Sequence, residues 1–505
     1  MDIRTRRPLV AAAVSISLLM VTAACSWSDT PASGAGGDGT LNVAGPLPIE
    51  NLDPHGTASM DGGTQLAARA LFSPLVTAAG PGKFKGDLAT KWAPNKDATQ
   101  WTFTLRAGVK YTDGTPVTAQ EVVASFERVL TAQGPLAGNF GGYSVTAPDK
   151  KTVVFTSETP DAAFLGKITS FFVTPKKAEK NGFFQKPIGS GPFKVESFEP
   201  GQSLKLSPNA DYWDGKPDLK NVEFMSIPEV SARMTALKTG EVDVTWGMPD
   251  DQIAQLRSDT NLSVDAVPSP GVNTMWMNSS TPALKDAEVR RALWQAVDFE
   301  SIIESLYPET GSPADSVVSP AVLGYAKQQP VKYDPAAAKA ALKKAGFDFG
   351  TKLRFQYSQP AFRQFVEAVA SDLAKVGVKA DPIEKEQAVF LEDLLAMKWD
   401  INIQQIGSQG YDAATNLGRL YPCAAKRTGY CNKELDENLA AAGATTDTAE
   451  RKDLYAKATK TIWTDAVGMY PMFVKQPYAW RKSVKGLEPA PDGMPTFAHV
   501  KVSDE

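Results

Sequence analysis

The sequence predicts an α/β protein of two or more lobes, and three observations lead to this class. The chain has 505 residues, more than one hydrophobic core usually serves, because single cores stop growing beyond about 250–300 residues. Its 43% hydrophobic and 22% charged residues are typical of a globular protein. Stretches that alternate apolar and polar residues stand among stretches with a helical period, which is the pattern of a mixed fold.

The first 24 residues are predicted to be a signal peptide. Three arginines precede a largely apolar run at residues 9–24, and small residues end that run. A membrane-spanning helix needs roughly 20 predominantly apolar residues, whereas this run is shorter and is interrupted by hydroxyl side chains. An uncleaved membrane anchor is the alternative interpretation.

The segment "VTAAC" at residues 21–25 resembles the lipobox of bacterial lipoproteins, in which the cysteine is acylated and becomes the new N-terminus. The resemblance implies that Cys25 carries the lipid and that the protein is anchored on the extracytoplasmic face of the cell membrane. Two or more acyl chains hold a protein stably at a membrane, whereas one holds it only marginally. Residues 25–40, rich in Ser, Gly and Pro, are predicted to be a flexible tether, so that the folded part begins near Leu41.

Charge and histidine content exclude several functions. The formal net charge is -4, so no electrostatic footprint for nucleic acid is present. The chain has only two histidines, His55 and His499, which stand near opposite ends of the predicted mature protein. We therefore expect no metal site, no histidine-based catalysis and no cofactor.

Two cysteines remain besides Cys25. Cys423 and Cys431 flank a short basic loop that contains a glycine. In an oxidising compartment two such neighbours are expected to form a disulfide. A pair of free thiols is the alternative, because the sequence does not show whether the Cβ atoms meet.

The first clearly patterned segment is a strand, a turn and a helix at residues 101–130. Residues 101–106 alternate large apolar with polar side chains, as in a half-buried strand, and "TDGTP" at residues 112–116 predicts a turn. The helix is expected to begin at Thr118, whose spacing from Glu121 is that of a capping box. One face of this helix collects the apolar residues Val122, Val123, Phe126, Val129 and Leu130.

Long helices dominate the second half of the sequence. One begins with Asp334 as N-cap and Pro335 at the first helical position, and it ends at Gly346. The segments at 362–377 and 448–463 have similar patterns. Strands are predicted between these helices, at residues 353–357 and 401–405.

The order of the motifs resembles that of the extracytoplasmic solute-binding proteins of ABC importers, specifically the peptide, dipeptide and nickel-binding family, family 5. The similarity runs from about Leu41 to Leu487. It is carried by "LATKW" (88–92), the segment 101–130, "PIGSGPFKV" (187–195), "NADYWDGKP" (209–217), "LKTGEVDV" (237–244), the segment 278–298 and "YDPAAAKAALKKAGF" (333–347).

The resemblance implies a two-lobed fold of the periplasmic-binding-protein type II class that closes about a hinge. Lobe I would comprise residues 41–75, 186–272 and 477–505, with an inserted subdomain at 76–185, and lobe II residues 273–476. Two crossover strands, near Val272 and Lys475, would form the hinge. A ligand that binds the closed form better shifts such an equilibrium toward closure.

Two stretches are expected to line the ligand cleft, because they fall at the places where family members line theirs. In lobe I the candidates are Trp246, Gly247 and Met248, and at the crossover into lobe II they are Asn273, Met275 and Trp276. Aromatic rings and a thioether accept varied side chains without a strict shape requirement. Core packing is the alternative for both tryptophans.

A third stretch departs from the family pattern. Peptide binders of the family carry Gly-Trp and then an Asp that pairs with the α-ammonium of the ligand. In "DINIQQIGSQGYDAAT" (400–415) the Trp is absent, Gln409 takes the place of the acid, and Asp412 serves only if the alignment shifts. Gln404, Gln405, Gln409 and Tyr411 equally suit a neutral, hydroxyl-rich ligand.

We therefore predict a monomeric receptor without enzymatic activity. It would capture a peptide or peptide-like solute and deliver it to an ABC permease, whose ATPase subunits hydrolyse ATP. The alternatives are an oligosaccharide or another non-peptide metabolite as ligand, or a role as a ligand sensor. A remote alternative is an envelope serine hydrolase, because Lys238 to Gly240 imitates the "KTG" motif of penicillin-recognising enzymes.

Overall fold

The computed structural model describes residues 39–503. The predicted signal peptide, the lipid-attachment residue Cys25 and nearly all of the predicted tether lie outside the described residues. The first described strand, β1 (Thr40–Ala44), begins one residue before the predicted start of the folded part. The described residues form 13 α-helices and a large mixed sheet, so the α/β class is confirmed.

Three large hydrophobic cores organise the described residues. Each core defines one part of the molecule. Lobe I has core residues mainly from 41–72, 193–246 and 478–500. The subdomain has core residues from 75–173, and lobe II has core residues from 275–472. The domain boundaries that the family resemblance implies stay a prediction.

Lobe I holds one side of the large sheet, in the order β10, β11, β12, β1, β13. Its central strand β1 is parallel to β12 and β13, and its residues Leu41 and Val43 are fully buried. The other strands are β10 (Phe193–Glu199), β11 (Ser203–Pro208), β12 (Asn221–Met225) and β13 (Val244–Trp246), and the helices are α1 (Gly62–Leu71), α4 (Val230–Thr239) and α5 (Asp250–Arg257). A short pair, β20 (Val484–Lys485) and β21 (Lys501–Val502), lies near the C-terminus.

Lobe II holds the other side of the sheet, where β18 pairs with β14 and β16, and β16 with β17. Its strands are β15 (Gly311–Pro313), β16 (Lys352–Tyr357), β17 (Lys379–Glu384) and β18 (Ile401–Ile406). Its helices are α6 (Ala287–Gln295), α7 (Phe299–Leu306), α8 (Pro335–Lys344), α9 (Arg363–Lys375), α10 (Gln387–Leu395), α11 (Leu417–Leu420), α12 (Lys433–Ala444) and α13 (Thr448–Thr464). The two strands and three helices predicted in this half are confirmed.

The start of α8 shows why the sequence pattern worked. The Asp334 side chain accepts a hydrogen bond from the Ala337 N–H at 2.8 Å, which satisfies a backbone donor that has no partner within the helix. Beyond its end, Gly346 has a φ of +71°, a left-handed conformation that glycine adopts without steric cost.

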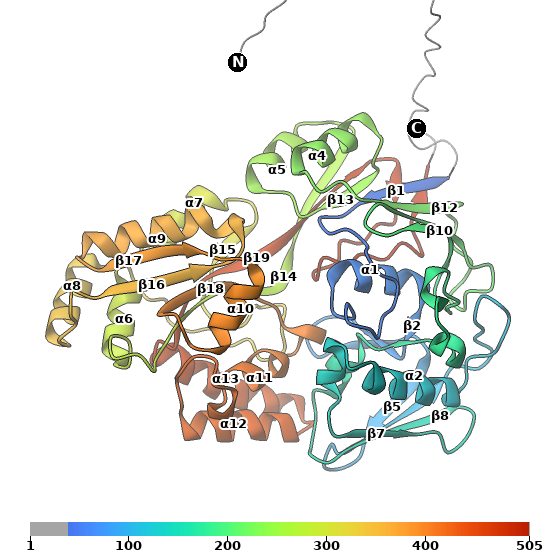
Figure 1. Cartoon of the computed structure of the whole chain (residues 1–505), viewed down its shortest axis with the longest axis horizontal. Coiled ribbons are helices and arrows are strands. Elements are labelled where there is room, and N and C mark those ends of the chain that lie inside the picture. The colour runs from blue at the N-terminus through green and yellow to red at the C-terminus, as the bar shows by residue number, and fades with distance from the viewer. Residues whose placement is uncertain (1–38, 504–505) are drawn as a thin grey trace, which may run out of the picture. The chain divides into compact units, whose positions relative to one another are not determined.

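Two long antiparallel strands join the lobes, β14 (Leu262–Met277) and β19 (Gly468–Arg481). Figure 1 shows both running from one side of the sheet to the other. Their register breaks after Pro268, which lies opposite Lys475, and resumes at Val272, opposite Phe473. Prolines lack the N–H that a ladder needs, so Pro268 and Pro270 interrupt the pairing at the two predicted crossover points.

The subdomain is a four-stranded sheet, in the order β5, β6, β8, β7, packed against α2 (Ala119–Ala132). The remaining elements are β2 (Ser73–Pro74), β3 (Val76–Ala78), β4 (Phe84–Gly86), β5 (Ala89–Pro94), β6 (Gln100–Leu105), β7 (Tyr143–Thr146), β8 (Thr152–Ser157), β9 (Phe172–Val173) and α3 (Phe164–Ile168). In β6, Trp101, Phe103 and Leu105 are buried, which confirms the predicted alternation.

The predicted capping box of α2 is wrong in its chemistry, although the helix begins where expected. Thr118 is the N-cap, but its side chain makes no capping hydrogen bond. Glu121 Oε2 instead accepts the Lys176 N–H at 2.6 Å, so the carboxylate serves the neighbouring segment rather than its own helix. Of the five apolar residues assigned to the inner face, Val122, Phe126 and Val129 are fully buried.

Within residues 39–503, no helix is both long and apolar enough to cross a bilayer.

Candidate functional site

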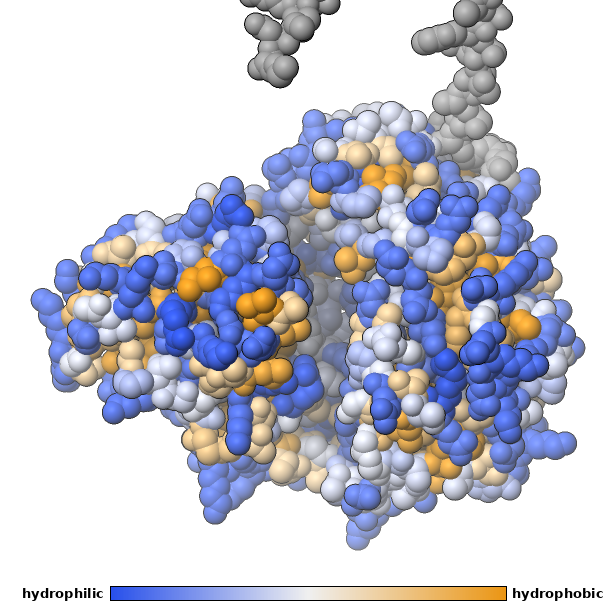
Figure 2. Space-filling view, in the orientation of Figure 1, coloured by the Kyte–Doolittle hydropathy of each residue, from blue (hydrophilic) through white to orange (hydrophobic). Residues whose placement is uncertain are grey.

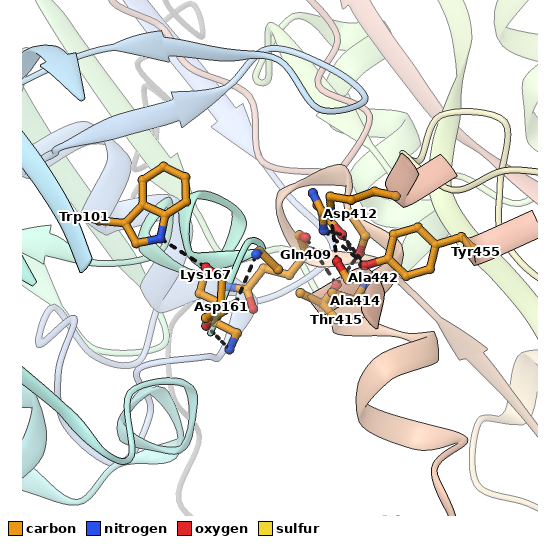
Figure 3. Close-up of polar contacts among 11 residues, drawn as sticks. Trp101, Asp161, Lys167, Gln409, Asp412, Ala414, Thr415, Ala442 and Tyr455 are labelled. Atoms are coloured by element: carbon orange, nitrogen blue, oxygen red, sulfur yellow. Dashed lines mark hydrogen bonds and ion pairs between the residues drawn. The ribbon is translucent and has the colours of Figure 1, made fainter. Parts of the chain in front are cut away.

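Gln409 connects lobe II to the subdomain. It lies in a short 3-10 turn, η5 (Gln409–Tyr411), that follows β18. Its Nε2 donates to Ser170 Oγ at 2.6 Å, and its Oε1 accepts from Asn139 Nδ2 at 3.3 Å. Figure 3 shows Gln409 between the subdomain residues around Asp161 and the lobe II residues around Asp412. The residue predicted to replace the family's ligand-binding acid therefore holds a contact between lobes.

The backbones of η5 and α3 touch at two glycines. A Cβ on Gly410 would lie 2.3 Å from Gly166 Cα, a distance that no side chain tolerates. Gly410 also has a φ of +61°. Nearby, the Ala162 N–H donates to the Gly443 carbonyl oxygen of α12 at 2.8 Å. Two backbone contacts thus accompany the Gln409 hydrogen bonds.

Asp412 does not offer a free acid. It is 3% exposed, it forms an ion pair with Arg451 at 2.9 Å, and its side chain accepts the Ala414 N–H at 2.9 Å. Tyr455 contributes a longer hydrogen bond at 3.4 Å (Figure 3). Because a buried carboxylate needs such partners, Asp412 holds the loop in shape, and it has a counter-ion already.

Tyr411 lies within electrostatic range of two charged groups of lobe I. Burial, together with the negative charge of Asp492, raises its pKa, while the nearby Arg69 acts in the opposite direction. Arg69 and Asp492 form an ion pair at 2.6 Å, and Arg69 also donates to the Met494 carbonyl oxygen at 2.7 Å. The predicted residue Tyr411 is thus brought to a polar group on α1 and the C-terminal segment. Figure 2 shows a hollow between the lobe I and lobe II sides of the molecule in that view.

Trp246 lies behind this group, in the core of lobe I. It is the last residue of β13, it is 3% exposed, and its ring stacks on Tyr478 with centroids 6.0 Å apart. The ring also covers Gly45, where an added Cβ would lie 2.6 Å from it. Trp246 therefore packs against Tyr478, whose hydroxyl donates to the Ala490 carbonyl oxygen at 2.8 Å.

The neighbours of Trp246 point elsewhere. Gly247 has a φ of +70°, and its N–H donates to the Pro477 carbonyl oxygen at 3.0 Å. Met248 is buried in a separate small core with residues of α4 and α5. The structure therefore makes Gly247 a turn residue and Met248 a core residue.

The crossover residues on β14 are also buried. Met275 is fully buried and Trp276 is 1% exposed. Trp276 Nε1 donates to the Tyr421 hydroxyl at 3.1 Å, so its polar atom has an internal partner. Asn273 is 3% exposed and its Oδ1 has no hydrogen-bond partner in the described structure, which leaves one acceptor unused beside β18.

A cavity of about 260 Å³ opens in lobe II at the carboxyl end of β18. Trp276 contributes to its lining, as do Gln404 and Gln405, the two predicted amides of β18. Gln405 is exposed, and Gln404 Nε2 donates to Asn402 Oδ1 at 3.0 Å. This cavity adjoins the η5 contact, since the lining residue Gly407 is two positions from Gln409.

The two cysteines of lobe II are joined. Cys423 and Cys431 form a disulfide that closes the loop between α11 and α12. Asp436 accepts the Cys423 N–H at 3.0 Å, which ties this loop to α12.

Nothing in the sequence indicates that several other residues belong to the site. Arg69 and Asp492 are 423 positions apart, and nothing local indicates that they pair. Asn139 and Ser170 are ordinary polar residues of the subdomain until Gln409 is placed between them. Only covariation among related sequences could have singled them out.

The arrangement suits binding. Within the described part of the chain, no group of three or more His, Cys, Asp or Glu side chains is placed to hold a metal ion. The "KTG" segment is explained by structure, because α4 ends at Thr239 and Gly240 caps it with a φ of +84° before β13. Polar side chains from both lobes and an adjoining cavity are the chemistry that this site offers.

Fold and site together define a class, a two-lobed α/β binding protein with its candidate site between the lobes. Residues 83–428 match the family described as "Bacterial extracellular solute-binding proteins, family 5 Middle". The probable D,D-dipeptide-binding periplasmic protein DdpA of Escherichia coli is 31% identical over 422 residues, 80% of this chain and 82% of that protein. The dipeptide-binding protein of the same bacterium is 28% identical over 469 residues, 82% of this chain and 85% of that one.

A solved structure gives the same result. The crystal structure of the ABC transporter substrate-binding protein CtaP from Listeria monocytogenes has a TM-score of 0.83 and 26% identity, and the match covers 93% of this chain and 100% of that one. The chain belongs to the bacterial extracellular solute-binding proteins of family 5. The resemblance stated from the motifs is confirmed, and with it the two-lobed fold.

Proposed function

We propose that this chain is the peptide-binding receptor of an ABC importer, anchored by a lipid on Cys25 at the extracytoplasmic face of the membrane. The site residues come from both lobes, which is the observation that carries the proposal. Gln409 of lobe II bonds to Ser170 and Asn139 of the subdomain, and Tyr411 lies within electrostatic range of the Arg69–Asp492 pair of lobe I. A ligand held between such groups favours the closed form, because only closure brings both sets into reach.

The related proteins support the choice of solute and partner. Two of them are named for dipeptides, and CtaP is described as an ABC transporter substrate-binding protein. The chain itself contributes binding and closure, and the permease and ATPase subunits contribute transport and ATP hydrolysis.

One observation favours a second ligand class. The only acid in the loop after β18, Asp412, already pairs with Arg451, so it does not offer the charge that a peptide α-ammonium needs. A buried ammonium without a counter-ion costs several kcal/mol. A neutral solute such as an oligosaccharide is therefore the second candidate, bound by Gln405, Gln409 and Tyr411 through hydrogen bonds and stacking.

Calorimetry on the purified protein distinguishes the two ligand classes, peptides and neutral solutes. We expect dialanine and trialanine to bind, and N-acetylation of trialanine to change the affinity by less than about threefold, because no free acid of the loop awaits the amine. Maltotriose is the probe for the second class. Binding of maltotriose without binding of either peptide would refute the peptide proposal.

The anchor has its own test. A Cys25→Ser variant is expected to appear in the medium or to stall in processing, because the acyl chains that hold the protein at the membrane are missing. Retention of that variant at the membrane in mature form would contradict the anchor.

A further inference from the structure

A carboxylate of lobe I holds a segment of lobe II beside the predicted hinge. Asp250 is the first residue of α5, a helix in the small core that also contains Leu262 of β14 and Ala479 of β19. Its Oδ1 accepts the N–H groups of Glu309 at 2.6 Å and of Thr310 at 3.0 Å, and its Oδ2 accepts the Thr310 hydroxyl. All three donors directly precede β15 of lobe II.

The segment that Asp250 holds is attached to the crossover strand β19. β15 pairs with residues 472–474 of β19, and the Thr310 carbonyl oxygen accepts the Lys475 N–H at 2.7 Å. Lys475 lies opposite Pro268, the last residue before the β14–β19 register breaks. Figure 1 shows α5 and α7 near each other at the junction of the two sides of the sheet. Thr310 therefore connects α5 to β19 at the point where the ladder between the lobes is interrupted.

The bonded groups of lobe II depend on this carboxylate. Thr310 is 8% exposed, and a buried N–H or hydroxyl without a partner costs free energy. The segment is also tightly packed, since a Cβ on Gly311 would lie 2.4 Å from Met472 Sδ and 2.8 Å from Tyr307 Cβ. If α5 moved away, the segment would have little room to follow it, and Thr310 would lose its partners.

The Asp250 carboxylate is not used by its own helix. The N-cap of α5 is Pro249, and no side chain caps the helix. Asp251, the second acid of the first turn, is exposed and interacts with the helix dipole in the same favourable way. Its side chain accepts a hydrogen bond from Gln252, and within residues 39–503 it makes no hydrogen bond or ion pair to lobe II. Two neighbouring acids thus differ in whether they reach across the lobes.

A second contact between the same elements is weaker. Arg257, at the end of α5, forms an ion pair with Glu309 at 2.6 Å, and its side chain is 44% exposed. Ion pairs between exposed side chains contribute little, because water and salt screen them. Hydrogen bonds to a charged acceptor are roughly twice as strong as neutral ones. Asp250 rather than Arg257 is therefore the residue that holds lobe II at this point.

We propose that Asp250 is a positioning residue for closure, which fixes the pivot about which lobe II turns relative to lobe I. The inference rests on the proposed receptor function, in which the solute binds by closure. A fixed pivot limits the orientations that lobe II adopts without ligand. The apparent affinity falls with the fraction of molecules in the binding-competent form, so Asp250 raises the affinity through Glu309 and Thr310 without contact with the solute.

The test compares variants at the two neighbouring acids. Asp250→Ala removes all three hydrogen bonds, and Asp250→Asn keeps an acceptor oxygen for the two N–H groups. Thr310→Val removes the hydroxyl from the lobe II side and keeps the shape of the side chain. Asp251→Ala is the matched control, because it removes the same charge from the same helical turn. X-ray scattering without ligand and calorimetry with trialanine are the measurements.

In the ligand-free protein, Asp250→Ala should have a larger radius of gyration than the wild type, whereas Asp251→Ala should match the wild type. Asp250→Asn should stay close to the wild type. Thr310→Val should show a smaller increase, and adding it to Asp250→Ala should change nothing more, because their shared bond is already lost. We expect Asp250→Ala to bind trialanine more weakly by about threefold or more, and Asp251→Ala to bind it like the wild type.

The scattering curves decide the inference independently of the ligand. If Asp250→Ala and Asp251→Ala superimpose while Asp250→Ala unfolds at a lower temperature, Asp250 has a merely structural role and the inference is overturned, although trialanine binding would leave the receptor proposal intact. An equal increase in both variants overturns it as well, because the effect then belongs to the helix charge. If the radius increases in Asp250→Ala and not in Asp251→Ala, but no protein binds trialanine, the peptide proposal fails and the pivot stands. Should Asp250→Ala not fold, Thr310→Val against the wild type decides in the same way.

Discussion

Two titratable residues in the N-terminal part of the fold, the buried His55 and the half-buried Asp87, have pKa values shifted in opposite directions. His55 is fully buried, and its Nε2 lies 2.8 Å from the Phe172 carbonyl oxygen, to which it donates as a neutral ring. Burial lowers the pKa of His55 to about 4. Asp87 accepts a hydrogen bond from Trp213 Nε1 at 3.1 Å, and burial raises the pKa of its carboxyl to about 7.

The two shifts give opposite contributions to the pH dependence of stability. Between about pH 4 and pH 6.5 the unfolded chain binds more protons at His55 than the native protein, so this residue makes stability rise with pH. Between about pH 3.8 and pH 7 the native protein binds more protons at Asp87, so this residue makes stability fall as pH rises. In the wild type the two contributions largely cancel.

Single replacements should therefore reveal two slopes of opposite sign. We expect His55→Gln to lose stability as pH rises from about 4 to about 6.5, and Asp87→Asn to gain it, with slopes that differ by about 2–3 kcal/mol per pH unit. Urea unfolding of both variants and the wild type over this range measures the slopes. Parallel curves for the two variants would show that the native protein does not hold His55 neutral and Asp87 protonated in this range.

At the scale of single residues, the sequence singled out candidate residues but did not predict which other residues surround their side chains. Trp246 and Trp276 were predicted to line the ligand cleft, with core packing as the alternative. Their burial at 3% and 1% exposure depends on Tyr478 and Tyr421, which lie far along the chain. Gln409 and Tyr411 were expected to meet the ligand. The structure gives Gln409 hydrogen-bond partners in the subdomain and places Tyr411 within electrostatic range of Arg69 and Asp492. Local residue patterns do not show which distant segments of the chain lie close together in the fold.

At the scale of elements, the close approach of η5 and α3 makes a prediction about glycine. A Gly410→Ala variant would place a Cβ within 2.3 Å of Gly166 Cα and keep a φ of +61°. We expect it to lower the free energy of unfolding by about 2–4 kcal/mol, because strain at a left-handed position adds to overpacking.

A second glycine of the same contact provides the control. Gly443 lies in α12, where an added Cβ meets nothing within 4 Å. Its carbonyl oxygen still accepts the Ala162 N–H after replacement. Gly443→Ala should be neutral or stabilise by up to about 1 kcal/mol, since alanine favours helix. Equal unfolding midpoints for the two variants in urea would contradict the steric account of Gly410.

The elements themselves were largely readable from local rules. N-cap and C-cap signals located α8, and alternation located β6, because these features depend on residues a few positions apart. The capping box of α2 failed for the opposite reason. Glu121 found a better-placed donor in Lys176, a residue that becomes its neighbour only through tertiary packing. Local signals are reliable until a distant segment competes for the same group.

At the scale of the whole molecule, the order of strands was beyond local patterns. The large sheet places β13 from the middle of the chain next to β19 near its end, and β19 next to β14. Periodicity predicts that such strands exist but not which ones pair, because pairing depends on topology. The two-lobed arrangement came from the order of motifs that the chain shares with its family.

The contact through Gln409 predicts how the ligand-free molecule behaves. If this contact helps to hold lobe II against the subdomain, its loss shifts the population toward more open forms. Each hydrogen bond is worth about 0.5–1.5 kcal/mol net, which changes a two-state ratio by about two- to tenfold. We therefore expect Gln409→Ala, which removes the bonds to Ser170 and Asn139 together, to enlarge the radius of gyration measured by X-ray scattering without ligand.

Two serine variants complete this experiment. Ser170→Ala removes one of the two bonds and should enlarge the radius of gyration less than Gln409→Ala does, and adding Ser170→Ala to Gln409→Ala should change nothing more, since their shared bond is already gone. Ser144→Ala, at an exposed position of β7 in the same subdomain, should match the wild type. Scattering curves for Gln409→Ala and Ser144→Ala that superimpose would mean that the lobes stay together without Gln409, through the η5–α3 and Ala162–Gly443 backbone contacts alone.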